Sequence, residues 1–181
     1  MLVTLDLMHY TETEQKKILK SMTVLVDTRE HEGKNNHILN YFAEKNIPWM
    51  KHKMDYGDYS CMIPANKDLS IPRDLYFDKQ IMIERKANLE EYSKNCTAER
   101  VRINTEFSLA PKRKVLLIEN ASYEKLVEGK YNTDYNPKSY WATVFSMWHR
   151  HDIPCFFMND VKYSGQFIFG YLYYFLRECI K

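Results

Sequence analysis

Short apolar runs alternate along the chain with polar segments that have helical periodicity. The runs are rich in β-branched and other apolar residues, as is typical of strands buried in a sheet. They lie at Thr23–Val26, Tyr59–Ile63, Ile81–Ile83, Val115–Ile118 and Ile153–Met158. Apolar residues at helical spacing lie between these runs at 36–45, 98–109 and 137–148, and again from about residue 160 onward. The alternation predicts an α/β fold with a central mixed β-sheet flanked by helices.

Charged residues end one of these runs, which is unusual for a buried strand unless the charges have a function. The third run continues into Glu84-Arg85-Lys86. Because side chains alternate along a strand, Glu84 and Lys86 point into the same space. Asp58 follows Gly57 immediately before the second run, and a hairpin between these two strands would bring Asp58 beside Glu84. Two acids and a lysine brought together predict a divalent metal site for phosphate-ester chemistry.

Asp27 directly follows the first buried run. An ionised carboxylate buried alone costs several kcal/mol, so Asp27 needs a partner, either a metal ion or the nearby Arg29. The alternative is an aspartate that caps the next turn. Since Asp58 and Glu84 already predict a metal site, we expect Asp27 to join it.

Three motifs, in this order, resemble the XPF-type branch of the PD-(D/E)XK nuclease superfamily, which comprises structure-specific DNA endonucleases. They are Val26-Asp27-Thr28-Arg29-Glu30, Gly57-Asp58-Tyr59 and Glu84-Arg85-Lys86, followed by Val115-Leu116-Leu117-Ile118-Glu119. The resemblance covers residues 23–120. One position departs from it: the family usually has an aspartate four residues after the motif lysine, where this chain has Glu90. The role of that position is therefore open.

The resemblance implies a restriction-endonuclease-like nuclease core and a metal-dependent DNA endonuclease. Branched or flapped DNA, as formed in recombination or repair, is the expected substrate. Asp27, Asp58 and Glu84 would supply oxygen ligands to Mg²⁺ or Mn²⁺. Lys86 would orient or deprotonate the attacking water and stabilise the transition state.

Further residues of these motifs are supporting candidates. The main-chain carbonyl of Arg85 would complete the metal shell. Glu30 matches an acid of the family motif and is a weaker ligand candidate. Arg29 would hold a carboxylate or a phosphate.

A basic segment follows the motifs, because residues 97–115 hold five basic and two acidic residues. Either a surface that tracks a phosphate backbone or an ordinary solvated rim would explain it. Within the helix 98–109, we expect Val101, Thr105 and Leu109 to face inward. The candidates for DNA binding are Arg100, Arg102, Lys112, Arg113 and Lys114.

The last helix is apolar nearly all round, which is more than one core face needs. Such a surplus often marks a subunit interface, and XPF-type nuclease domains commonly pair. We therefore expect a homodimer built by this helix, with the helix that begins at Asn136-Pro137 as a second contact. The aromatic stripe of that second helix is expected in the core, and His149 and His151 at its end are expected to be solvated.

The chain of 181 residues is long enough for one domain with a sizeable core. We expect a single nuclease domain, 1–181, made of an N-terminal extension (1–22), the nuclease motifs (23–120) and an aromatic-rich helical part used in dimerisation (121–181). The extension should contain a short polar helix outside the core, started by a capping box of Thr11 and Glu14. A formal net charge of +2 permits nucleic-acid binding through a local patch without indicating it.

The four cysteines are far apart and form no Cys-x-x-Cys pair, which is typical of buried thiols in a reducing cytosol. The first ten residues lack the features of a secretion signal. The most apolar segment, 167–176, is too short and too rich in tyrosine to cross a bilayer. We expect a cytoplasmic protein without membrane contact. Its many Lys, Asn, Ile and Tyr residues point to a small AT-rich genome such as that of a phage or mobile element.

Two other functions fit the same residues. A nuclease-like module could bind branched or single-stranded DNA without cutting it, although a silent copy has no physical need to keep mutually repelling carboxylates together. An intracellular interaction protein would instead use Glu84-Arg85-Lys86 as a solvated charge run. This last possibility requires the acids at 27, 58 and 84 to lie far apart.

Overall fold

The computed structural model describes residues 10–30 and 33–181, so the expectation for the first nine residues lies outside the part described. Within this part, seven strands form one mixed sheet in the order β2-β1-β3-β5-β6-β7, with β4 paired to the end of β3. The strands are β1 (Thr23–Asp27), β2 (Trp49–His52), β3 (Tyr59–Ile63), β4 (Leu75–Tyr76), β5 (Ile81–Lys86), β6 (Arg113–Glu119) and β7 (Cys155–Met158). The expected α/β fold is confirmed.

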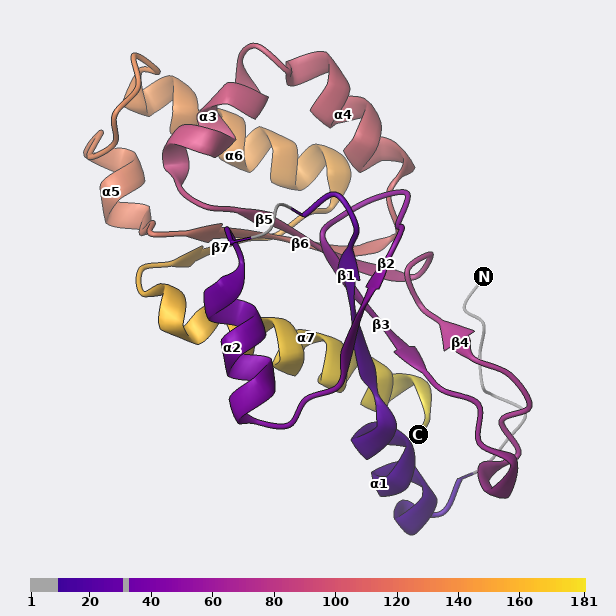
Figure 1. The fold of residues 1–181 in the computed structure, drawn as a ribbon. Coiled ribbons are helices and arrows are strands. Elements are labelled where there is room, and N and C mark those ends of the chain that lie inside the picture. Colours follow the sequence, from indigo (N-terminus) through magenta and orange to yellow (C-terminus); the bar gives the residue numbers. More distant parts are fainter. Residues whose placement is uncertain (1–9, 31–32) are drawn as a thin grey trace.

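Helices cover both faces of this sheet. In Figure 1, α2 and α7 lie on one side of it, and α3, α4 and α6 lie on the other. The α-helices are α1 (Glu12–Ser21), α2 (Asn36–Glu44), α3 (Leu89–Cys96), α4 (Arg100–Leu109), α5 (Tyr123–Val127), α6 (Pro137–His151) and α7 (Ser164–Cys179), with 3-10 helices η1 (Lys67–Leu69) and η2 (Val161–Tyr163).

The alternation of side chains along each strand divides the apolar residues between two cores. Ile83 and Val115 enter the core on the side of α7, whereas Met82 and Leu116 enter the core on the side of α4. The same alternation continues into the charged end of β5. As a result, the side chain of Arg85 lies on one face of the sheet, and those of Glu84 and Lys86 lie on the other.

The expected hairpin is present: β3 runs antiparallel to both β1 and β5, with Tyr59 paired to Ile83. Two main-chain hydrogen bonds then place the residue before β3. The amide of Asp27 donates to the carbonyl of Asp58 at 2.9 Å, and the amide of Asp58 donates to the carbonyl of Ile83 at 2.9 Å. Asp58 is therefore fixed between the end of β1 and the middle of β5.

Gly57 is required at its position for two reasons. Its φ angle of +75° lies in the left-handed region, where other residues are strained. A Cβ atom there would also lie 2.7 Å from the sulfur of Met82. The close approach of the chain before β3 to β5 thus depends on a residue without a side chain.

Two helices differ from expectation. The capping box that starts α1 is confirmed, but Ile18 and Leu19 are buried in the α7-side core, so this helix is not outside the core. In α4, Ile103 and Phe107 face inward, whereas Val101 is 83% exposed and Leu109 63% exposed. Ile103 and Phe107 form the larger apolar pair at four-residue spacing, and burying them removes more apolar surface from water.

The apolar surplus of α7 is accounted for within the chain. Its residues Ile168, Leu172 and Leu176 are fully buried, and most of its remaining aromatic residues are partly buried against the same core, where the helix contacts α1, α2 and β3. A subunit interface is therefore not needed to explain this helix. Among the described residues, none of the helices is long and apolar enough to cross a membrane. Of the four cysteines expected to be buried, Cys61 and Cys96 are buried, whereas Cys155 and Cys179 are half-buried.

The aromatic stripe of α6 lies only partly in the core. Tyr140, Val144 and Met147 are buried. Trp141 is 38% exposed, and its indole nitrogen donates to the hydroxyl of Tyr123 at 2.7 Å. The prediction that the whole stripe belongs to the core was therefore wrong for Trp141.

Candidate active site

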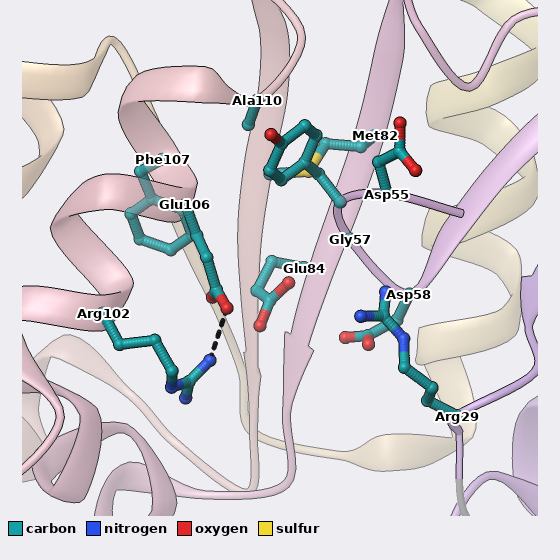
Figure 2. Close-up of a pocket in the computed structure, with 11 residues that line it drawn as sticks. Arg29, Asp55, Gly57, Asp58, Met82, Glu84, Arg102, Glu106, Phe107 and Ala110 are labelled. Atoms are coloured by element: carbon teal, nitrogen blue, oxygen red, sulfur yellow. Dashed lines mark hydrogen bonds and ion pairs between the residues drawn. The ribbon is translucent and has the colours of Figure 1, made fainter. Parts of the chain in front are cut away.

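A pocket of about 140 Å³ lies over β5, on the sheet face that carries α4. In Figure 2, Asp58 and Arg29 lie on one side of Glu84, and Arg102 and Glu106 lie on the other. The lining residues are Arg29, Asp55, Tyr56, Gly57, Asp58, Met82, Glu84, Arg102, Glu106, Phe107 and Ala110. The pocket is thus bounded by the chain before β3, by β5 and by α4.

Asp58 and Glu84 are the two expected ligands that line this pocket. One oxygen of Asp58, Oδ2, accepts a hydrogen bond of 2.7 Å from the main-chain amide of Arg85. Burial and the neighbouring Glu84 carboxylate raise the pKa of Asp58 well above its ordinary value. Two neighbouring carboxylates repel each other, so a cation between them is favoured.

Lys86 is held at the same site. Its ammonium lies 2.7 Å from Oε1 of Glu84, and both side chains are nearly buried, at 11% and 13% exposure. Burial alone would lower the pKa of Lys86, but the carboxylates of Glu84 and Asp58 raise it. Without a metal ion the lysine is therefore charged at neutral pH, which suits it to stabilising negative charge.

Asp27 is paired with Arg29, one of the two partners expected for it. Its carboxylate accepts hydrogen bonds from the amide and guanidinium of Arg29, at 2.7 Å, 2.9 Å and 3.1 Å, and from the amide of Met54 at 2.9 Å. Burial alone would raise the pKa of Asp27, but these hydrogen bonds lower it. Without a metal ion, Asp27 is thus paired with Arg29, and its role as a ligand beside Asp58 and Glu84 stays a prediction. Arg29, the alternative partner, satisfies this buried carboxylate, and its own side chain lines the pocket.

The donor set fits a small hard cation. In the described part of the chain, no three acidic, histidine or cysteine side chains are grouped so that they could hold a metal ion. Mg²⁺ is usually bound through one or two carboxylates, with water and substrate phosphate completing its shell. Asp58 and Glu84, whose charges repel each other, supply that number of ligands.

The side chain of Arg85 lies on the opposite face of β5, where it is paired with two carboxylates. It binds Glu30 at 2.6 Å and Glu119 at 2.7 Å. The carboxylate of Glu30, a weaker ligand candidate, is paired with Arg85 on this face, and its role as a ligand stays a prediction. The three consecutive charges of the motif thus serve two sites, one on each face of the strand.

The five basic candidates do not form one surface. Arg102 lines the pocket, where it is paired with Glu106 at 2.6 Å and closely with Glu99. Arg100 and Lys112 are exposed. Of the five candidates, Arg102 alone lines the pocket, and both interpretations of the basic segment stay open.

The basic side chains of the turn before β6 do not form one surface. Lys114 is 7% exposed, and its ammonium donates to the carbonyl of Pro111 at 3.2 Å. Arg113 lies over the ring of Phe175 in α7, on the other face of the sheet. Neither of these two residues lines the pocket, and their role in binding a phosphate backbone stays a prediction.

Glu90, which stands where the family usually has an aspartate, contacts a distant loop. Its Oε1 accepts a hydrogen bond of 2.8 Å from the amide of Asn132. In this structure, Glu90 therefore connects the start of α3 to the segment between α5 and α6.

His151 was expected to be solvated, but it is 8% exposed and connects α6 to the pocket helix α4. Its Nε2 lies 2.9 Å from Oδ1 of Asn104, and its Nδ1 lies 3.3 Å from the hydroxyl of Ser108. Asn104 also accepts from Arg150 at 2.9 Å. These bonds fix α4 in the position that presents Arg102 and Glu106 to the pocket.

The environment of His151 predicts a pH-dependent stability. Burial, followed by the charges of Arg150 and Lys114, lowers the pKa of His151 below its ordinary value. The unfolded chain therefore takes up a proton at this residue before the folded chain does, so the free energy of unfolding falls as the pH drops below about 6.5. Urea unfolding at pH 7.5 and pH 5.0 should show a smaller pH-dependent loss for His151→Gln than for the unmodified protein. The exposed neighbour His149→Gln should leave that loss unchanged, and an equal effect of both substitutions would contradict the assignment.

Several residues of the site were not singled out by the sequence. Asp55, Glu106 and Phe107 line the pocket. They could be identified only once the orientation of α4 about its axis and the path of the loop before β3 were known. Glu119 is different, because it ends a buried strand as Asp27 and Lys86 do. The reasoning applied to those two residues could also have identified Glu119.

The fold and sequence are similar to those of known proteins. The sequence model of one family, described as the ERCC4 domain, matches residues 26–171. XPF from Aeropyrum pernix has a similar solved structure, with a TM-score of 0.60 and 17% identity over 86% of this chain and 65% of that one. XPF from Aeropyrum pernix in complex with DNA gives a TM-score of 0.61 and 15% identity, over 86% and 66%. This chain therefore spans less than two thirds of the length of either structure. No curated protein matches its sequence.

Proposed function

The chain belongs to the ERCC4 domain family, and from this premise we propose that it is a metal-dependent endonuclease that hydrolyses phosphodiester bonds in DNA. One observation carries the proposal. Asp58 and Glu84 line the same pocket, and the ammonium of Lys86 is bound to Glu84. A site with two acids and a charged lysine suits the hydrolysis of a phosphate ester, because the substrate is an anion that must be held close to its attacking group.

Asp58 and Glu84 would hold a divalent cation, Mg²⁺ or Mn²⁺. When bound, such an ion lowers the pKa of a coordinated water and neutralises charge on the phosphate. The amide of Arg85 fixes the orientation of Asp58. Lys86, kept charged by its acidic neighbours, would stabilise the charge that develops on the phosphate oxygens.

Two arginines on opposite sides of the pocket would bind the substrate backbone. Arg29 is held in place by Asp27, and Arg102 by Glu99 and Glu106. Guanidinium groups match the geometry of phosphate oxygens and can bind them through two hydrogen bonds. Asp27 would therefore serve the site indirectly, by orienting Arg29.

DNA as the substrate is supported by the family and by the relative that was solved with DNA. A preference for branched or flapped DNA, and thus a role in repair or recombination, is the finer part of the proposal. The cytoplasmic location and the origin in a phage or mobile element stay predictions from the sequence.

A cleavage assay on flap, fork, Holliday junction and plain duplex DNA tests the proposal. We expect incision with Mg²⁺ or Mn²⁺, loss of incision with a chelator, and faster incision of branched DNA than of duplex. Recovery of activity when the metal is restored after chelation is the control for irreversible damage. Incision that continues in excess chelator would contradict the metal-dependent mechanism.

The expected homodimer stays a prediction, and the helix proposed for its interface changes from α7 to α6. Since α7 is buried against the core, α6 is the better candidate, because Trp141 is exposed and Phe145 and Trp148 continue the aromatic face. Light scattering at tens of micromolar would show whether two chains associate.

A further inference from the structure

The face of β5 opposite the pocket carries a buried network of charged side chains. Arg85 donates through Nη1 to Oε2 of Glu119 at 2.7 Å and through Nη2 to Oε1 of Glu30 at 2.6 Å. The other oxygen of Glu119, Oε1, lies 2.7 Å from Nε2 of His37. Arg85 and Glu119 are nearly inaccessible, at 5% and 2% exposure. The turn after β1 and the end of β6 thus meet the guanidinium of β5, and the start of α2 joins this network through Glu119.

The same arginine contacts the pocket through its main chain. Its amide donates to Oδ2 of Asp58 at 2.7 Å. The amide and the side chain belong to one strand residue, so the ion pairs that hold the guanidinium also restrict the position of the Arg85 backbone, together with the pairing of β5 and β6. The orientation of the Asp58 carboxylate therefore depends on how firmly Glu30 and Glu119 hold Arg85.

Stability alone is a weak reason for this network. Burying a charged group costs several kcal/mol, and apolar residues of similar size often stabilise a core as well or better. Here the charges lie at the edge of the core that contains Val26, Ile83 and Leu117, and Arg85 is in the strand that also bears Glu84. Their position behind Asp58 gives them a function that apolar residues could not supply.

We propose that Glu119 and His37 are positioning residues for the metal site, which they reach through Arg85. Glu119 holds the guanidinium from the β6 side, and His37 holds Glu119 from α2. Together they keep the Arg85 amide directed at Asp58, so that the carboxylate keeps the orientation in which it can bind an ion. This inference rests on the proposed function, because it requires that Asp58 binds a metal.

Metal binding measured without DNA tests the inference, with Mn²⁺ titrated into the protein in a calorimeter. Residues that orient a metal ligand typically change affinity by 10- to 100-fold when they are replaced. We expect Glu119→Ala to weaken Mn²⁺ binding by about that factor. Glu119→Gln, which restores an oxygen acceptor for Arg85, should recover most of the loss. His37→Ala should have a smaller effect in the same direction, because Arg85 keeps both of its carboxylates.

Ile168→Val is the control, since it removes one methylene from the same core and no polar group of the network. It should leave Mn²⁺ affinity unchanged. Equal affinities of Glu119→Ala, His37→Ala and the unmodified protein would overturn the inference, as would an equal loss in Ile168→Val. If Glu119→Ala does not fold, the Mn²⁺ affinities of His37→Ala and Glu119→Gln decide whether the inference holds.

The inference and the proposed function fail in different ways. If the unmodified protein binds Mn²⁺ and Asp58→Asn does not, the metal site stands, and the network variants alone decide the inference. If the unmodified protein does not bind Mn²⁺ at all, the metal site is refuted and the inference falls with it.

Discussion

Replacing Asp58 by asparagine should abolish DNA cleavage and, at the same time, stabilise the metal-free protein. Asparagine keeps an oxygen that can accept the hydrogen bond from Arg85 but removes the charge that would hold the metal ion. Metal ions contribute several kcal/mol to charge stabilisation in such reactions, so the cleavage rate should fall by about 10³-fold or more. Single-turnover cleavage with saturating enzyme measures this loss.

The gain in stability follows from the direction of the pKa shift. Burial and Glu84 raise the pKa of Asp58 in the folded state, so its ionised form at pH 7 opposes folding. Asparagine is neutral at every pH and removes that penalty. Without metal, Asp58→Asn should therefore unfold at a higher urea concentration than the unmodified protein at pH 7, and the difference should shrink as the pH falls. A variant that is less stable at pH 7, or one that still cleaves, would contradict the assignment.

Replacing Lys86 by methionine should also remove activity, but with the opposite effect on stability. Methionine has a similar length and leaves Glu84 without its cation. Loss of a contact that stabilises charge in the transition state typically lowers the rate roughly 10²- to 10³-fold. Breaking one half of a nearly buried ion pair costs about 3 kcal/mol.

Metal should partly reverse this second loss of stability. In Lys86→Met, an ion bound by Asp58 and Glu84 would neutralise the glutamate that the lysine no longer balances. Urea unfolding with and without Mg²⁺ should therefore show a larger stabilisation of this variant than of the unmodified protein. Lys94→Met, an exposed lysine in α3, is the matched control and should change neither rate nor stability. Equal Mg²⁺ effects in both proteins would argue against a metal site next to Lys86.

The sequence predicted the residues that depend on strand alternation. Period-two alternation placed Glu84 and Lys86 on one face of β5 and Arg85 on the other, and the structure has this arrangement. The hairpin that brings Asp58 beside β5 followed from the order of the apolar runs. These features are local, so the chain itself specifies them.

Errors arose where the partner of a charge or the rotation of a helix depends on tertiary packing. The sequence offered two partners for Asp27, a metal ion and Arg29. In the structure, the guanidinium of Arg29 donates hydrogen bonds to both carboxylate oxygens. In α4, apolar residues occur on two sides, so the periodicity did not determine which side faces the sheet. His151 was misplaced for the same reason, since its partners Asn104 and Ser108 belong to a distant helix.

The three consecutive charges at the end of β5 also limit how this strand can change. A shift of one residue would exchange the two faces of the sheet, placing Arg85 in the acidic pocket and burying Glu84 and Lys86 among the groups that hold the guanidinium. Such a chain would lose its active site and its buried charge balance together. Insertions and deletions should therefore be absent between Ile81 and Lys86 in functional relatives, while the flanking loops remain free to vary in length.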